Sequence, residues 1–149
     1  MREHENYMKK AVELARTAFD KGEVPVGAVV VREGEVIGEG YNQTEGRNDP
    51  TAHAEILAIK EAAGKLENWR LTDCTLYSTK EPCPMCAGAI YQARLNRLVF
   101  GTYDLKAGYA GTLFNVLQDK RLNHQVEVES GLLADECRSL LQQFFQKLR

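Results

Sequence analysis

The sequence has no apolar stretch long enough to cross a membrane. Its longest apolar run, around residues 24–31, is much shorter than the roughly 20 residues that a membrane-spanning helix needs. The first residues, MREHENYMKKAVELA, lack the apolar core and the small-residue cleavage site of a secretory signal. Both absences lead us to expect a cytoplasmic protein that has no membrane partner.

The chain also lacks a strong excess of charge of either sign. Its 19 Lys and Arg residues nearly balance its 21 Asp and Glu residues, which leaves a formal net charge of −2. Proteins that attract nucleic acids through a general positive field are strongly basic. If the partner of this chain is a nucleic acid, recognition must therefore rest on a local basic patch and a pocket.

Cysteine is scarce, with four residues in a chain of 149. Four cysteines in an expected cytoplasmic protein do not indicate a disulfide framework. Cys83 and Cys86 form a C-x-x-C pair, whereas Cys74 and Cys137 have no neighbour at such a spacing, and we interpret these two as small buried apolar residues. The length and the 44% hydrophobic content are typical of one globular domain, which we expect over residues 1–149.

Hydrophobic periodicity predicts an α/β fold. Apolar residues at helical spacing predict helices over residues 5–21, 52–63, 84–94, 113–117 and 132–148. Short β-rich runs predict strands over residues 26–32, 36–41, 74–79, 98–102 and 126–129. The last three strands are joined through helices and are expected to be parallel, with only the first hairpin antiparallel. We predict a three-layer α/β/α fold, in which helices cover both faces of a mixed five-stranded sheet.

Two short strings, HAE at residues 53–55 and PCPMC at residues 82–86, carry most of the chemical information. A proline such as Pro84 suits the first position of a helix, so both thiols would face the positive end of the helix dipole, which favours the thiolate. His53, Cys83 and Cys86 then supply three ligands. Three protein ligands and one open position are the arrangement of a catalytic zinc site, and we expect one zinc ion per subunit.

Two other interpretations of these strings were weighed. A C-x-x-C pair can be a redox motif, but that hypothesis leaves the HAE string unexplained. A structural zinc site needs a fourth protein ligand, and the spare candidates, His4, His124, Cys74 and Cys137, are not part of any motif. Catalytic zinc is therefore the favoured interpretation.

Glu55 is the acid that remains beside the predicted ligands. Zinc lowers the pKa of a bound water from about 15.7 to near 7, so hydroxide becomes available at neutral pH. Hydroxide can attack an electron-poor ring carbon that carries an amine, while Glu55 moves protons to a ring nitrogen and to the departing amine. The pattern H-x-E followed by P-C-x-x-C is the known signature of zinc deaminases.

The strings NDPTAHAE, EPCPMC, FGTYDLKAGYAGT and LLADEC extend this signature along the chain. On these residues the sequence resembles the cytidine deaminase-like superfamily and, within it, the bacterial tRNA-specific adenosine deaminases. The zinc core is shared with cytosine and guanine deaminases, and the second half of the chain favours the tRNA enzymes. Lys80 departs from the family pattern, because members often have an apolar residue there.

The resemblance implies conversion of adenosine to inosine at the wobble position (34) of a tRNA anticodon, chiefly of an arginine tRNA. Attack would occur at C6 of the adenine, and the enzyme would be a homodimer. The alternative is a small-molecule deaminase that acts on guanine or cytosine. A further hypothesis, an inactive RNA-binding or zinc-structural protein, would leave Glu55 without a role.

The resemblance also implies contacts with RNA. Asn42 would touch the flipped nucleotide, Asp104 and Lys106 would line the path of the anticodon loop, and Phe145 would pack against a flanking base. Each has a plain structural alternative: a turn for Asn42, a loop cap for Asp104, exposed surface for Lys106 and core packing for Phe145. The apolar helix at residues 84–94 is the candidate dimer interface.

Overall fold

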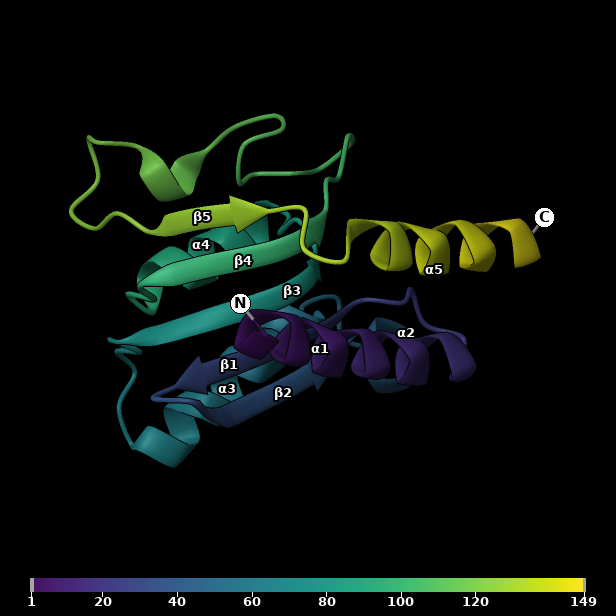
Figure 1. Cartoon of the computed structure of the whole chain (residues 1–149), viewed down its shortest axis with the longest axis horizontal. Coiled ribbons are helices and arrows are strands. Elements are labelled where there is room, and N and C mark those ends of the chain that lie inside the picture. Colours follow the sequence, from purple (N-terminus) through teal and green to yellow (C-terminus); the bar gives the residue numbers. More distant parts are fainter. Residues whose placement is uncertain (1, 149) are drawn as a thin grey trace.

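The computed structural model describes residues 2–148 and contains the predicted helices and strands, with ends that differ by a few residues (Figure 1). The helices are α1 Arg2–Asp20, α2 Thr44–Arg47, α3 Ala54–Leu66, α4 Pro84–Gln92 and α5 Ala134–Lys147. The strands are β1 Gly27–Arg32, β2 Glu35–Tyr41, β3 Cys74–Lys80, β4 Arg97–Thr102 and β5 Glu127–Ser130. Two details were not predicted: α2 lies in an expected loop, and the expected helix at 113–117 is the 3-10 turn η1 Val116–Gln118.

The five strands form one mixed sheet in the order β2-β1-β3-β4-β5. The expected parallel pairing of β3, β4 and β5 is confirmed. The expectation that only the first hairpin is antiparallel is wrong, because β1 also pairs antiparallel with β3. The reason is the connection through α3, which carries the chain from β2 past β1 to β3 and leaves β1 between two strands that run against it.

Helices cover both faces of the sheet, as predicted (Figure 1). Helices α1 and α5 pack on one face, and α3 and α4 pack on the other. Successive residues of a strand point to opposite faces, so β1 contributes to two cores: Val29 and Val31 pack with Met8 of α1, whereas Ala28 and Val30 pack with the helices behind the sheet. The three-layer α/β/α fold class is thereby confirmed.

Helix α3 lies unusually close to strand β2. A Cβ atom placed on Gly38 would lie 2.2 Å from the carbonyl oxygen of Ala58, and one placed on Gly40 would lie 2.3 Å from that of Ala54. Real Cβ atoms do not approach backbone so closely, so both positions require glycine. The backbone of α3, which begins beside the predicted zinc ligands, therefore rests directly on the strand.

The two cysteines outside the C-x-x-C pair are buried in the core. Cys74 and Cys137 are free and buried, as predicted, and burial raises the pKa of Cys137 to about 12. Within residues 2–148, no helix is both long enough and apolar enough to cross a membrane.

Candidate active site

The candidate site lies at one edge of the sheet, where three strands end. Because β2, β3 and β4 run in the same direction, their carboxyl ends meet at this edge. Asn42 directly follows β2, the Glu81-Pro82-Cys83 segment follows β3, and Asp104 follows β4 by one residue. Ligand sites of open α/β sheets form at this edge.

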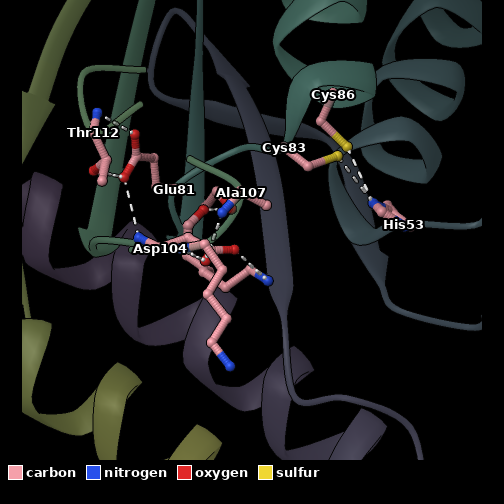
Figure 2. Close-up of polar contacts among 10 residues, drawn as sticks. His53, Glu81, Cys83, Cys86, Asp104, Ala107 and Thr112 are labelled. Carbon is pink, nitrogen blue, oxygen red and sulfur yellow. Dashed lines mark hydrogen bonds and ion pairs between the residues drawn. The ribbon is translucent and has the colours of Figure 1, made fainter. Parts of the chain in front are cut away.

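Two helix N-termini bring the predicted zinc ligands together. His53 is the N-cap residue of α3, and Cys83 is the N-cap residue of α4, with Pro84 in its first turn as predicted. The His53 Nδ1 atom lies 3.6 Å from Cys83 Sγ and 3.4 Å from Cys86 Sγ (Figure 2). All three ligand atoms lie within 4.8 Å of one another.

These separations fit a tetrahedral zinc ion. Zinc–sulfur bonds of about 2.3 Å and zinc–nitrogen bonds of about 2.0–2.1 Å at tetrahedral angles place sulfur and nitrogen about 3.5 Å apart. Among the described residues, these three form the one His, Cys, Asp and Glu cluster with such spacing. Three protein donors without a fourth among the described residues fit the open-site arrangement of catalytic zinc rather than the closed structural one.

The charge state of the two thiols suits metal binding. The Cys86 thiol donates a hydrogen bond to the Cys83 sulfur, which, with a further hydrogen bond from His53, lowers the pKa of Cys83 to about 4. The same pairing and burial raise the pKa of Cys86. The Cys83 sulfur in turn raises the pKa of His53 through their hydrogen bond. This pairing favours the thiolate at Cys83, and a metal cation would displace the proton from the second thiol.

Glu55 lies in the first turn of α3 and is only 3% exposed. Burial is the main cause that raises the pKa of its carboxyl group. Glu55, His53 and Cys83 line the same cavity of about 200 Å³. A buried carboxyl group with a raised pKa, placed beside three metal ligands, is suited to carry a proton.

Asn42 lines this cavity too and is buried. Its Oδ1 atom is buried without any hydrogen-bond partner in the described part of the chain. An unpartnered buried acceptor costs free energy, and such groups are found at functional sites among other places. Asn42 therefore offers an unused hydrogen-bond acceptor in the cavity that His53 and Glu55 line.

Asp104 and Lys106 lie in the loop after β4 and do not line the cavity. Asp104 Oδ1 accepts hydrogen bonds from the backbone of Lys106 and Ala107, and its Oδ2 pairs with Lys80 Nζ at 3.1 Å. Burial opposes ionisation of Asp104, but the Lys80 ammonium and these two amides keep the pKa of its carboxyl group below the usual value. Asp104 thus caps the loop, and Lys80 connects it to the cavity wall. These contacts do not test its expected place along the path of the anticodon loop, which stays a prediction.

Phe145 lies near the end of α5, which extends past the sheet in Figure 1. Its ring is 47% exposed and packs edge-on against Phe144, which is buried and packs against Phe19. Phe144 is thus the core residue of this pair, and Phe145 is the exposed one. Phe145 does not line the cavity.

Two buried glutamates, Glu81 and Glu23, hold segments near the site and were not predicted from the sequence. Glu81 accepts hydrogen bonds from the loop after β4, and Glu23 accepts hydrogen bonds from the backbone of Glu45 and Gly46 in α2. The available signal was an acidic residue beside an apolar segment, since Glu81 directly follows a buried strand and Glu23 directly precedes VPVGAVVV. Acidic residues are rarely buried unless they are paired.

Comparison with known proteins identifies the family. Residues 2–149 match the model of the MafB19-like deaminases. A tRNA-specific adenosine deaminase of Bacillus subtilis is 51% identical over 149 residues, which cover 100% of this chain and 92% of that protein. One of Haemophilus influenzae is 51% identical over 146 residues, which cover 97% of this chain and 84% of that protein.

Comparison with solved structures points to the same family. A structure from work on A-to-I editing by tRNA:A34 deaminases superposes with a TM-score of 0.88 at 41% identity and covers 91% of this chain and 99% of that chain. A guanine deaminase of Bacillus subtilis gives a TM-score of 0.66 at 45% identity over 73% of this chain and 70% of that chain. The resemblance in the sequence is confirmed, and the chain belongs to the family of the tRNA-specific adenosine deaminases.

Proposed function

We propose that the protein deaminates adenosine to inosine at wobble position 34 of a tRNA anticodon, with an arginine tRNA as the substrate. The observation that carries the deamination chemistry is the three-donor cluster beside buried Glu55, in a cavity of about 200 Å³, and the choice of RNA rests on the 51% identity to tRNA-specific adenosine deaminases. Such a cavity is smaller than a typical drug-sized pocket and suits a single base. An RNA substrate would flip one nucleotide into it.

His53, Cys83 and Cys86 would hold a zinc ion. Bound zinc supplies Lewis-acid chemistry that lowers the pKa of water to near 7. The Glu55 carboxylate takes a proton from the attacking water and delivers it to a ring nitrogen of adenine. The hydroxyl group now on C6 then gives its proton to Glu55, which passes it to the departing amine as the bond between C6 and the exocyclic nitrogen breaks and the C6 carbonyl forms, so that adenosine and water give inosine and ammonia.

We propose the following contacts with the RNA and with a second subunit. Asn42 Oδ1 accepts a hydrogen bond from the flipped nucleotide, while Asp104, Lys106 and Phe145 lie along the path of the anticodon stem-loop. A second subunit would pack on α4, where Gly88 has no atom within 4 Å of a built Cβ. We place this homodimer in the cytoplasm, where tRNA is available.

The experiment that tests the function compares substrates of different size. The zinc-loaded protein is incubated with an anticodon stem-loop that carries adenosine at position 34, and the nucleosides are then analysed by mass spectrometry. We expect inosine and ammonia from the stem-loop and no turnover of free guanine or cytosine. Turnover of free guanine with an unchanged stem-loop would instead support a small-molecule deaminase. The 45% identity to a guanine deaminase is the observation that favours this alternative.

Replacing Asn42 by alanine is expected to lower kcat/KM for the stem-loop by roughly 5- to 150-fold, the equivalent of about 1–3 kcal/mol for a buried acceptor. Because Oδ1 has no partner in the free protein, the melting temperature should not fall. Steady-state kinetics and thermal melts measure both effects, with Gln43→Ala as the neighbouring control. A lower melting temperature with unchanged kinetics would instead assign Asn42 to the turn after β2.

A further inference from the structure

The loop after β4 is held by three consecutive residues that precede the ligand Cys83. The Glu81 carboxylate, which is fully buried, accepts hydrogen bonds from the backbone amides of Asp104 at 3.1 Å, Ala110 at 3.0 Å and Thr112 at 3.0 Å, and also from the Thr112 hydroxyl (Figure 2). The carbonyl oxygen of Pro82 accepts a hydrogen bond from the Tyr109 amide at 2.9 Å. The loop 104–112 therefore folds around the end of β3.

Gly108 shows how closely the loop encloses this carboxylate. A Cβ atom built on Gly108 would lie 2.3 Å from Cδ of Glu81 and 2.3 Å from its Oε1 atom. The loop backbone thus passes directly over the carboxylate, at a distance that only glycine allows. A buried charge without partners would cost several kcal/mol, and the amides of the loop supply the partners here.

The third contact connects the loop to the cavity. Asp104, whose amide is held by Glu81, pairs through Oδ2 with Lys80 Nζ at 3.1 Å, and Lys80 lines the cavity beside His53 and Glu55. An ammonium group has three N–H donors, so this ion pair leaves donors free at the cavity wall. The hydrogen bonds of the Glu81 side chain go to the loop and not to α4.

We propose that Glu81 is a positioning residue for RNA binding. It fixes the loop 104–112 so that Asp104 holds the Lys80 ammonium at the wall of the cavity, where the remaining N–H donors meet a backbone phosphate next to the target nucleotide. Glu81 itself touches neither the substrate nor the zinc ligands. This inference rests on the proposed function, because it names the part of the site that binds the RNA backbone.

The test uses two variants that disturb the same contact from opposite sides. Glu81→Gln keeps the shape but turns one acceptor into a donor that faces loop amides, and Gly108→Ala places a methyl group against an unchanged carboxylate. For both variants we expect KM for the anticodon stem-loop to rise at least about tenfold, since misplacement by about 1 Å can cost as much as 10²-fold. The zinc content should stay at one ion per chain, and kcat should stay within about threefold because Glu55 is not displaced.

A second measurement does not depend on the substrate. Hydrogen–deuterium exchange should speed up at the amides of Asp104, Ala110 and Thr112 in both variants, with no change in α3. Gly64→Ala is the matched control for the alanine substitution, because a Cβ atom at Gly64 has no neighbour within 4 Å. Glu23→Gln is the matched control for the loss of a buried carboxylate that binds another segment, and it should leave exchange in loop 104–112 unchanged.

The possible results separate this proposal from the proposed function. If the wild-type protein does not convert the stem-loop, the proposed function fails, and the RNA-binding role of Glu81 fails with it. If the wild type is active but both variants keep its KM, or lose zinc, or lose kcat at an unchanged KM, the positioning role is wrong although the function stands. A rise in KM together with faster exchange in the loop supports the proposal.

Discussion

Replacing Glu55 by glutamine is expected to lower kcat for the stem-loop by roughly 10²–10⁴-fold, the usual contribution of a positioned acid–base group. Glutamine has nearly the same shape, but its amide cannot take a proton from water and pass it to adenine. Zinc should stay bound, because Glu55 is not one of the three ligands. Single-turnover kinetics and metal analysis by mass spectrometry measure these two properties separately.

The stability of this variant gives a second criterion. Burial opposes the charged form of Glu55, whose carboxyl group is almost inaccessible to solvent. A neutral amide is easier to bury than a carboxylate, so Glu55→Gln should melt no lower than the wild type at neutral pH. Glu61→Gln, the same change at an exposed position of α3, is the matched control. Wild-type turnover by Glu55→Gln would refute the assignment of proton transfer to this residue.

Removing the metal is expected to abolish activity completely. A chelator should yield metal-free protein without turnover, and added zinc should restore it. The variant Cys86→Ser should lose zinc affinity by more than about 100-fold, since even changes outside the ligand set cost about 10–100-fold. Zinc should also stabilise the fold by about 4.1 kcal/mol at a concentration 1,000 times its dissociation constant, which thermal melts with and without zinc would detect.

Zinc affinity is expected to fall as the pH falls, because zinc binds the deprotonated forms of cysteine and histidine.

Cys74→Ala is the matched control for Cys86→Ser. Cys74 is buried, yet it lies outside the ligand cluster, and this variant should keep zinc and activity. Chelated protein that retains full turnover would contradict the zinc chemistry, whatever its effect on the melting temperature.

The grouping of His53, Cys83 and Cys86 beside Glu55 could be predicted from the sequence because each half of the signature is local. His53 and Glu55 lie within one helix start, and Cys83 and Cys86 within another, so spacing and the proline at position 84 were sufficient. Glu81 could not be predicted in this way. Its partners, the amides of Asp104, Ala110 and Thr112, lie 23 to 31 residues later, and only the fold of the sheet brings them to the carboxylate.

The same limit explains why the antiparallel pairing of β1 with β3 and the contacts of Asp104 within the protein were not predicted. Each hairpin or helical connection predicts the relation of two consecutive strands, but the antiparallel pairing of β1 with β3 arises between strands that are not consecutive. The resemblance implies that Asp104 lies along the RNA path, which stays a prediction, but it does not give the contacts that Asp104 makes within the protein. Its two loop amides and its ion pair with Lys80 depend on side-chain directions that a motif does not contain.

The close contact between α3 and β2 fixes the position of the helix along the strand. Gly38 and Gly40 are two residues apart on a strand, about 6.6 Å, and the carbonyl groups of Ala58 and Ala54 that rest on them are four residues apart on a helix, about 6 Å. The two spacings match, so the carbonyl groups of Ala54 and Ala58 can both contact the strand, each at one glycine. Slippage by one turn would shift Glu55 by about 5.4 Å, out of hydrogen-bond reach of any bound base. Two glycines that touch no substrate thereby fix the position of Glu55 relative to the sheet.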